Sequence, residues 1–223
     1  MIKGFLFDLD GVITDTAKLH YLSWAKTVEK LGIIYTEEEN EKLRGIPRLE
    51  TLKLILKLKG KENDYTHEQL LELADEKNNT YVQLLKEKLD PSWLLPGIEQ
   101  FLKDAKADNV KLSLASSSHN ARYILDRLGI TEYFDAFADP KNIKHGKPAP
   151  DIFIEAAKLI NVDPEFCVGL EDALAGVEAL NKANIRSIAF DYNSNVDFSG
   201  ADLIYHNTSE LDYKKVKDFF DNK

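Results

Sequence analysis

The sequence has few of the features that cross-link a chain or anchor it in a membrane. Among its 223 residues there is one cysteine, Cys167, so no internal disulfide can form. Because Cys167 stands in an apolar run, we expect a buried free thiol. No apolar run approaches the roughly 20 residues of a membrane-spanning helix. The apolar residues 2–7 end at Asp8 and are too few for a signal peptide, so we expect a cytoplasmic protein with no membrane partner.

Positive charges are fewer than negative ones. The chain has 29 lysine and arginine residues against 38 aspartate and glutamate residues, which gives a net charge of −9 at pH 7. This balance argues against a nucleic-acid surface, and we expect no nucleic-acid partner. It does not exclude an anionic substrate, because a bound divalent cation and a few lysines reverse the field inside a cleft. We find no repeat, no low-complexity segment and no interface pattern, and we expect a monomer.

The order of the apolar patterns predicts an α/β fold. Residues 2–8 form a short apolar and aromatic run that is typical of a buried strand. Residues 16–89 show only helical spacing, with Thr66 as an N-cap and with ends near Gly32 and Gly60. The later segments alternate between expected helices (98–107, 120–128, 150–160, 174–183, 213–220) and expected strands (111–115, 136–138, 166–170, 186–190, 203–205).

Alternation of this kind predicts a doubly wound parallel sheet, a Rossmann-like arrangement. We therefore expect residues 1–15 and 92–223 to form an α/β core domain. Residues 16–91 would form an α-helical domain inserted after the first strand.

Polar residues follow three of the expected strands at the point where each strand ends. They are Asp8 and Asp10, then Ser116, Ser117 and Ser118, then Glu171 and Asp172, and Lys147 precedes the helix that leads to the third strand. Because ligands bind at the carboxyl ends of parallel strands, we expect these groups to share one edge. Each group alone has an ordinary explanation, since Asp-x-Asp is common in turns and serines or acids often begin helices. Their conjunction in this order favours a shared site.

The grouped residues suit phosphoryl transfer. Mg²⁺ prefers hard oxygen ligands, and these are offered by Asp8, a backbone oxygen near Asp10, Glu171 and Asp172. A carboxylate such as Asp8 can act as a nucleophile and form an acyl phosphate. The repulsion between two anions must be neutralised, and Lys147 and the Ser116 hydroxyl fit that need. Asp10 could pass a proton to or from the substrate oxygen.

These motifs resemble those of the haloacid dehalogenase superfamily of phosphoryl-transfer enzymes over the whole chain. The matching segments are Asp-x-Asp-Gly-x-x-x-Asp at 8–15, Ser116, Gly-Lys-Pro-x-Pro-Asp at 146–151 and Gly-x-Glu-Asp-x-x-x-Gly at 169–176. The resemblance implies that Asp8 is the nucleophile and Asp10 the general acid/base, while Ser116 and Lys147 orient the phosphate. It implies one Mg²⁺ in the site, held by Asp8, Asp10, Glu171 and Asp172. It also implies that the helical insertion is a cap domain.

Within the superfamily the chain most resembles the β-phosphoglucomutase family, through residues 7–16, 45–48, 77–78, 115–120 and 170–172, together with His20 and Trp24. The resemblance implies a set of substrate-binding residues: His20, Trp24, Gly45, Ile46, Arg48, Lys77, Asn78, Ser117, Ser118, His119 and Asn120. In that family a Gly-x-x-Arg loop contacts the sugar bisphosphate, which would put Arg48 on the phosphate that is not transferred. Lys77 and Asn78 would support that end, and His20 would help to hold Asp10.

Several of these residues have a competing structural interpretation. Arg48 could be a surface charge, and Lys77 and Asn78 could lie on a solvated helix face. His20 could be a hydrogen-bonded structural histidine, and Trp24 fits the core of the helical domain.

Three positions depart from the family pattern. The family's loop is Gly-Val-Ser-Arg followed by Ser, whereas this chain has Pro47 before the arginine and Thr51 in place of the later serine. Pro47 removes a hydroxyl and a backbone donor. His119 stands where the family has lysine. These changes affect substrate choice rather than the phosphoryl-transfer residues.

The resemblance implies an isomerase that interconverts β-D-glucose 1-phosphate and glucose 6-phosphate. An aspartyl phosphate would form on Asp8, with β-glucose 1,6-bisphosphate as intermediate and activator. The alternative is a sugar-phosphate phosphatase of the same superfamily, in which water accepts the phosphoryl group. A third possibility is a non-catalytic phosphosugar-binding protein, against which the intact Asp8, Lys147 and acidic pair argue.

Overall fold

The computed structural model describes residues 1–43 and 46–222 of the chain. They form two compact units, one of Met1–Asp15 with Asp90–Lys223 and one of Thr16–Leu89. We expected the helical insertion to run to residue 91, whereas this helical unit ends at Leu89. Among the described residues, no helix is both long and apolar enough to cross a lipid bilayer.

The larger unit is built on a six-stranded parallel sheet. The strands are β1 (Gly4–Phe7), β2 (Lys111–Leu114), β3 (Ala136–Phe137), β4 (Cys167–Glu171), β5 (Arg186–Phe190) and β6 (Leu203–Tyr205). Their order is β3-β2-β1-β4-β5-β6, and every neighbouring pair is parallel. The predicted doubly wound parallel sheet is confirmed. The strand order reverses between β1 and β4, which is where ligands bind in such sheets.

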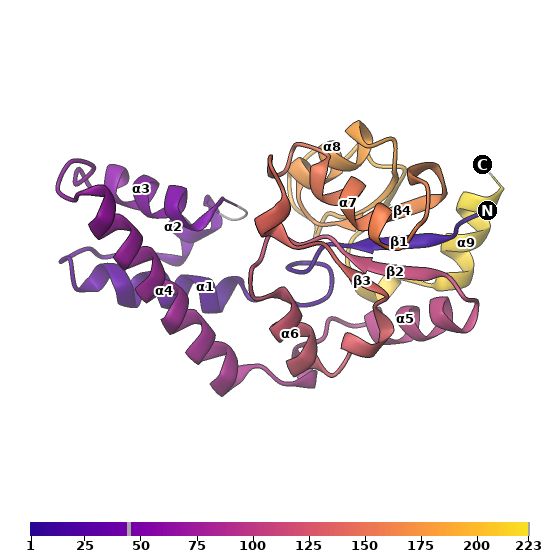
Figure 1. The fold of residues 1–223 in the computed structure, drawn as a ribbon, viewed down its shortest axis with the longest axis horizontal. Helices are drawn as coiled ribbons and strands as arrows, with labels where there is room; N and C mark the ends of the chain where they lie inside the picture. Colours follow the sequence, from indigo (N-terminus) through magenta and orange to yellow (C-terminus); the bar gives the residue numbers. More distant parts are fainter. Residues whose placement is uncertain (44–45, 223) are drawn as a thin grey trace. The chain divides into compact units, whose positions relative to one another are not determined.

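Helices cover both faces of this sheet. They are α5 (Ile98–Ala107), α6 (Ala121–Leu128), α7 (Asp151–Leu159), α8 (Leu174–Lys182) and α9 (Tyr213–Asp221). Figure 1 shows α7 and α8 on one side of the sheet and α5 and α6 on the other. Short 3₁₀ turns lie at Pro91–Trp93, Thr131–Tyr133, Pro140–Asn142, Pro164–Phe166 and Thr208–Glu210.

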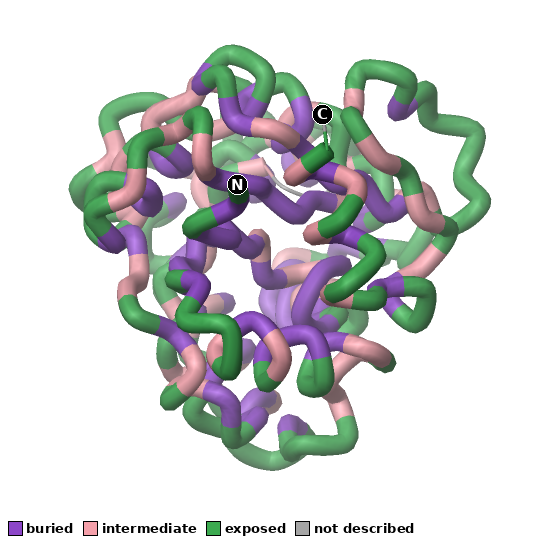
Figure 2. The backbone as a smooth tube through the Cα atoms, turned by 90° about the vertical axis from the view of Figure 1, so that its right-hand side faces the viewer, coloured by how far each residue is buried: buried purple, intermediate pink, exposed green. Residues whose placement is uncertain are grey.

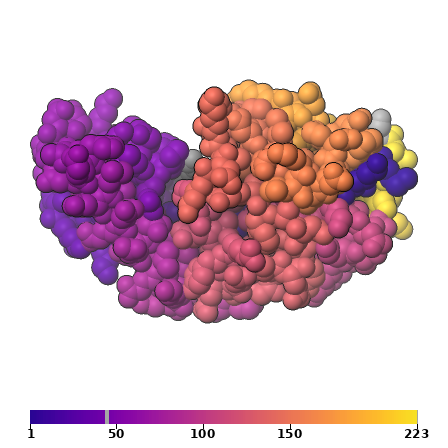
Figure 3. All heavy atoms as spheres, in the orientation of Figure 1, coloured from indigo at the N-terminus to yellow at the C-terminus, as the bar shows by residue number. Residues whose placement is uncertain are grey.

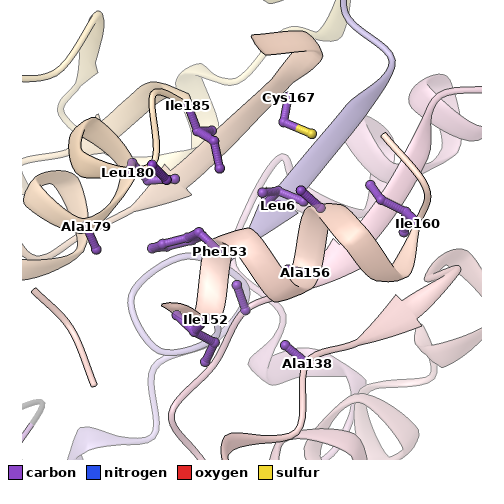
Figure 4. Packing of buried hydrophobic residues seen from close by; sticks show 13 residues of the cluster. Leu6, Ala138, Ile152, Phe153, Ala156, Ile160, Cys167, Ala179, Leu180 and Ile185 are labelled. Atoms are coloured by element: carbon purple, nitrogen blue, oxygen red, sulfur yellow. The ribbon is translucent and has the colours of Figure 1, made fainter. Parts of the chain in front are cut away.

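The central strand β1 is buried on both faces, which explains its apolar and aromatic sequence. On one face, the ring of Phe5 lies 4.9 Å from the ring of Phe101 in α5 and 6.2 Å from that of Tyr213 in α9. On the other face, Leu6 joins a hydrophobic cluster with Phe153 of α7 (Figure 4). The run of residues 2–8 is therefore the centre of the core.

Burial follows the same layout. In Figure 2 the buried strands run through the middle of this unit, and exposed loops surround them. In the space-filling view of Figure 3 the covering side chains hide most of β1, and indigo atoms of the first residues reach the surface at one end. Cys167 at the start of β4 is buried as a free thiol, as predicted.

One strand boundary bears on the site. We expected Glu171 to follow its strand, but Glu171 is the last residue of β4 and pairs in register with Ala189 of β5. The carboxylate of Glu171 is buried and hydrogen-bonded, so the sheet ladder continues through a residue that polarity alone would place outside it.

The helical unit contains α1 (Ala17–Glu29), α2 (Glu37–Glu41), α3 (Arg48–Leu58) and α4 (His67–Lys88). Thr66 is the N-cap of α4, as predicted, and it forms a capping box with Gln69. The short helix α2 was not predicted, because its five residues are polar and show no apolar period. Its own capping box, between Thr36 and Glu39, is what starts it.

The described residues of the helical unit include an apolar core cluster. Its buried members come from α1, α3, α4 and the segment after α1: Trp24, Val28, Ile33, Tyr35, Leu52, Ile55, Leu56 and Leu70. Within α3, Leu52, Ile55 and Leu56 recur at helical spacing, so one face of that helix packs into this cluster.

Candidate active site

Carboxylates from two neighbouring strands meet a lysine at the carboxyl edge of the sheet. Phe7 of β1 is in register with Leu170 of β4, so the next residues, Asp8 and Glu171, lie side by side. The ammonium Nζ of Lys147 donates to Asp8 Oδ1 and, at 2.5 Å, to Glu171 Oε1. The structure thus brings together three of the residues that the sequence placed at one edge.

Asp172 completes an acidic cluster. One carboxylate oxygen each of Asp8, Glu171 and Asp172 lie within 4.8 Å of one another. The second oxygen of Glu171, Oε2, accepts the backbone N–H groups of Asp172 at 3.1 Å and Ala173 at 3.2 Å. Within the described part of the chain, this cluster does not include the Asp10 side chain, for which we expected a backbone oxygen. Such a set of hard oxygen donors suits Mg²⁺.

Two glycines make room for this cluster. A Cβ atom on Gly11 would lie 1.9 Å from Asp172 Oδ2, and one on Gly176 would lie 1.9 Å from Glu171 Oε1. Gly11 also has a φ of +78°, which side chains disfavour. Both glycines belong to the predicted motifs but had no predicted role, although their spacing from the acidic residues was a signal.

The loop that follows β1 is a tight turn. The N–H groups of Ile13 and Thr14 donate to the carbonyl of Leu9 at 2.8 and 3.1 Å. Asp10 and Thr14 form an isolated bridge, and the Thr14 hydroxyl donates to the Trp93 carbonyl at 2.8 Å. The backbone of Asp10 is therefore held at a fixed place, two residues beyond Asp8.

The serine triplet lies at the same edge, after β2. Ser116 is buried, and its hydroxyl oxygen accepts the N–H of Ser118 at 3.1 Å. Ser118 in turn accepts the N–H of Asn120, the N-cap of α6, at 3.3 Å. Ser117 and His119 are exposed. The serines thus shape the turn into α6 and place the Ser116 hydroxyl at the edge of the sheet.

Electrostatics in the site centre on Lys147. Burial alone would lower the pKa of this ammonium, but the carboxylates of Asp8 and Glu171 outweigh burial and raise the pKa of Lys147 above its usual value. Burial raises the pKa of Glu171 to about 6; Lys147 opposes this shift and the charge of Asp8 adds to it. Lys147 therefore stays charged and partly neutralises the acidic cluster.

The loop that carries Lys147 is held on both sides. The peptide between Lys147 and Pro148 is cis, and the Pro148 carbonyl accepts a hydrogen bond from Lys182 of α8 at 2.9 Å. His145 Nδ1 lies 3.0 Å from the carboxylate of Asp151, the first residue of α7. The Lys147 ammonium also lies 4.8 Å from the ring centre of Phe153.

In the helical unit Lys77 lies among three aromatic side chains: the predicted His20 and Trp24, and Tyr81, which was not predicted. Lys77 Nζ donates to His20 Nδ1 at 2.7 Å and lies 4.7 and 5.2 Å from the ring centres of Tyr81 and Trp24. The His20 ring lies 4.1 Å from the Tyr81 ring. Lys77 is buried, so the alternative that it lies on a solvated helix face is wrong. Tyr81 follows Lys77 by one helical turn, a spacing that could have indicated the contact.

The remaining predicted residues lie nearer the surface of the helical unit. Arg48 begins α3, and its guanidinium is 3.1 Å from the carboxylate of Asp75. Ile46 and Asn78 are half-buried, and the Ile46 carbonyl accepts the Thr51 hydroxyl at 3.0 Å. Gly45 lies outside the described residues.

Comparisons with known proteins agree with this geometry. Residues 2–184 match the family described as haloacid dehalogenase-like hydrolase. The β-phosphoglucomutase of Bacillus subtilis (strain 168) is 44% identical over 210 residues, which covers 94% of this chain and 92% of that protein. The phosphorylated carbohydrates phosphatase of Thermotoga maritima is 32% identical over 192 residues, 84% of each chain. A crystal structure of β-phosphoglucomutase from Clostridium difficile matches with a TM-score of 0.91 and 42% identity, covering 100% of this chain and 98% of that one.

Proposed function

Because the chain belongs to the haloacid dehalogenase-like hydrolase family, we propose that it is an isomerase that interconverts β-D-glucose 1-phosphate and glucose 6-phosphate. The observation that carries this proposal is the 44% identity to a β-phosphoglucomutase over 94% of the chain, against 32% to a sugar-phosphate phosphatase. The acidic cluster with its buried lysine supplies the chemistry that such a reaction needs.

In this proposal Asp8 carries the phosphoryl group and Asp10 moves the proton. Phosphorylated Asp8 transfers its phosphoryl group to a hydroxyl of the sugar monophosphate while Asp10 takes the hydroxyl proton, which forms β-glucose 1,6-bisphosphate. A carboxylate oxygen of Asp8 then attacks the other phosphoryl group of the bisphosphate. Asp10 returns the proton to the oxygen that leaves. The bisphosphate is thus both intermediate and activator.

Lys147 and Ser116 orient and neutralise the phosphoryl group. Lys147 contacts the nucleophilic carboxylate of Asp8, so its ammonium is already beside the oxygen that attacks. Its pKa lies above the usual value, which keeps the charge in place at neutral pH. A fixed positive charge at the point where negative charge gathers lowers the barrier to transfer.

The acidic cluster fits Mg²⁺ because its three carboxylates offer hard oxygen atoms, while Lys147 contacts two of them, Asp8 and Glu171. We assign Asp8, Glu171 and Asp172, with a backbone oxygen of Asp10, as the residues that would hold one ion. When bound, Mg²⁺ supplies a second positive charge for the phosphoryl oxygens. Gly11 and Gly176 leave the space that the two carboxylates beside them occupy.

We further propose that the helical unit, Thr16–Leu89, acts as a cap that controls the access of water and substrate. Arg48 suits the phosphate that is not transferred, because its planar fork pairs with phosphate oxygens. Its present partner, Asp75, is an exposed surface carboxylate, and such pairs exchange readily. Lys77 beside His20 gives the same unit a buried positive charge.

One assay separates the three candidate functions. The protein receives β-glucose 1-phosphate, Mg²⁺ and a trace of glucose 1,6-bisphosphate, and glucose 6-phosphate and inorganic phosphate are followed separately. We expect glucose 6-phosphate without stoichiometric phosphate. Release of phosphate without isomerisation would establish the phosphatase instead. Binding of the sugar phosphate with neither product would favour a non-catalytic protein, and α-glucose 1-phosphate tests the choice of anomer.

We propose, in addition, that the protein works as a monomer in the cytoplasm. Its one cysteine is a buried free thiol, which suits a reducing compartment. Light scattering coupled to gel filtration should give a mass near the 25.3 kDa of one chain.

A further inference from the structure

A tyrosine that follows β5 is bonded to the backbone of the loop that carries Asp8 and Asp10. The hydroxyl of Tyr192 donates to the carbonyl of Gly11 at 2.8 Å. Gly11 is buried, whereas Tyr192 is 43% exposed, so the ring reaches inward from the surface to make this contact. No role was predicted for Tyr192 from the sequence.

The Cα atom of the residue that accepts this bond, Gly11, lies against the Asp172 side chain. A Cβ atom on Gly11 would meet Asp172 Oδ2 at 1.9 Å, Cγ at 2.2 Å and Cβ at 2.8 Å, so the Asp172 side chain rests on the Gly11 Cα. On its other side, the Gly11 N–H donates to the Thr14 carbonyl at 2.7 Å. Any movement of the Gly11 peptide therefore displaces the surface that sets the position of the Asp172 carboxylate.

The backbone at Tyr192 is strained. Tyr192 and Asn193 have φ values of +49° and +55°, a left-handed conformation that residues with side chains adopt rarely. Asp191 stabilises this turn, because its Oδ1 accepts the N–H of Asn193 at 2.8 Å and the Nδ1–H of His206 at 3.0 Å. Strain of this kind persists only where surrounding contacts enforce it, and it is common at functional sites.

We infer that Tyr192 is a positioning residue for the metal-binding carboxylate of Asp172, acting through the carbonyl of Gly11. The inference rests on the proposed Mg²⁺-dependent phosphoryl transfer. The hydrogen bond from Tyr192 fixes the position of the Gly11 peptide relative to β5. The Gly11 Cα in turn limits where the Asp172 side chain can lie. The hydroxyl is the essential group, since the ring alone cannot hold the carbonyl.

The test compares Tyr192→Phe with a matched control, Tyr205→Phe. Both rings pack on Phe190, at centroid distances of 6.5 and 6.4 Å. The hydroxyl that donates to the Gly11 carbonyl belongs to Tyr192. Tyr205→Phe therefore removes a nearby hydroxyl and leaves that hydrogen bond in place. Calorimetry measures the Mg²⁺ affinity of the unphosphorylated proteins without any substrate.

We expect Tyr192→Phe to weaken Mg²⁺ binding about fivefold, the effect of one lost hydrogen bond, and Tyr205→Phe to leave it unchanged. Circular dichroism should show the same fold for both. In turnover, excess Mg²⁺ should restore kcat of Tyr192→Phe while KM for the sugar phosphate stays at the unmodified value, which a general loosening of the fold would not allow.

The outcomes separate this inference from the proposed function. Unchanged Mg²⁺ affinity in Tyr192→Phe, or an equal loss in both variants, overturns the role of Tyr192 even if isomerisation is found. A loss of Mg²⁺ affinity in Tyr192→Phe alone supports the positioning role of Tyr192. If the unmodified protein then releases phosphate without isomerisation, that role stands and the proposed isomerase function is overturned. If the unmodified protein binds no Mg²⁺, both fail.

Discussion

Lys147 and Asp8 form the contact on which the candidate site depends. Their side chains are 13% and 14% exposed, so neither charge is well solvated. Removing one member of such a pair leaves the other partly buried and unbalanced. If the Asp8 carboxylate is removed, the free-energy penalty for the buried charge of Lys147 is reduced, because Glu171 is a second carboxylate partner.

We therefore expect that Asp8, the proposed nucleophile, can be replaced without unfolding the protein. We expect Asp8→Asn to lower turnover by on the order of 10⁴-fold or more, since the amide cannot form the acyl phosphate. Coupled-enzyme kinetics would measure this loss, with circular dichroism as the control for folding. Substantial remaining isomerase activity would show that Asp8 is not the nucleophile.

Arg48 allows a separate test of the helical unit. We expect Arg48→Ala to reduce kcat/KM for the sugar phosphate on the order of 10²-fold, because a charge-assisted hydrogen bond to phosphate is lost. Phosphorylation of Asp8 by a small acyl phosphate should continue at the unmodified rate. Lys53, which pairs with Glu50 on the same helix, provides a control as Lys53→Ala. Equal loss of both activities would contradict the assignment of Arg48 to the second phosphate.

Cys167 leads to a prediction about pH. Burial raises the pKa of this thiol from 9.0 to about 12. The unfolded chain therefore loses this proton at a lower pH than the folded chain, so the contribution of Cys167 to the free energy of unfolding falls as pH rises from about 9 to 12. At pH 8 the native thiol should resist a disulfide reagent that reacts at once after denaturation, as absorbance would show. Rapid labelling of native protein would mean that Cys167 is accessible.

At the scale of elements, three helix-to-strand connections share one backbone conformation. Asn109, Asn161 and Asn184 follow α5, α7 and α8 with φ values of +58°, +55° and +55°. In each case the next residue donates its N–H to a carbonyl five residues earlier, as Val162 does to Ala157 at 3.1 Å. This is a Schellman ending, with asparagine at the position that glycine usually takes.

The positive φ of Asn161 predicts different effects on stability for its replacement by alanine and by glycine. We expect Asn161→Ala to lower the free energy of unfolding by about 1 kcal/mol, because alanine lacks the short polar side chain whose local hydrogen bonds let asparagine adopt a positive φ. Asn161→Gly should be neutral or slightly stabilising. Urea denaturation of the two variants against the unmodified protein measures both. Equal stability of the alanine and glycine variants would show that φ does not limit the connection.

The predicted helices and strands of the core lie close to the observed ones because local patterns determine them. Helix 98–107 is α5, and the three connections begin within two residues of the predicted helix ends. Two errors have physical causes. The helix α2 forms through its capping box without an apolar face, and β4 extends to Glu171 because Lys147 balances a charge that would otherwise end the strand.

At the scale of the molecule, the residues of the candidate site that lie at the ends of parallel strands could be predicted from the sequence, whereas the contact that supports them from Tyr192 could not. Asp8, Lys147 and Glu171 converge as expected, because the sheet order brings their segments to one edge. The bond from Tyr192 to Gly11 had no sequence signal, since it joins a surface ring to a backbone carbonyl. The roles given to these residues remain predictions for the experiments above.

Metal binding gives a test on the whole protein. If Mg²⁺ binds the folded chain alone, a concentration of 100 times Kd should stabilise it by about 2.7 kcal/mol and raise Tm by roughly 5–10 °C. Differential scanning calorimetry with and without EDTA measures the shift. Asp172→Asn should reduce it strongly, because that carboxylate belongs to the acidic cluster. The same shift in that variant would place the ion elsewhere.

The position of β1 in the sheet has a consequence for how the protein is made. Gly4 of β1 pairs with Lys111 of β2 and Cys167 of β4, which leave the ribosome long after it. The helical unit, Thr16–Leu89, is continuous in the chain and is complete before either partner strand has emerged. During synthesis the helical unit is therefore complete first, and β1 can pair, and the candidate site assemble, only after the later strands have been made.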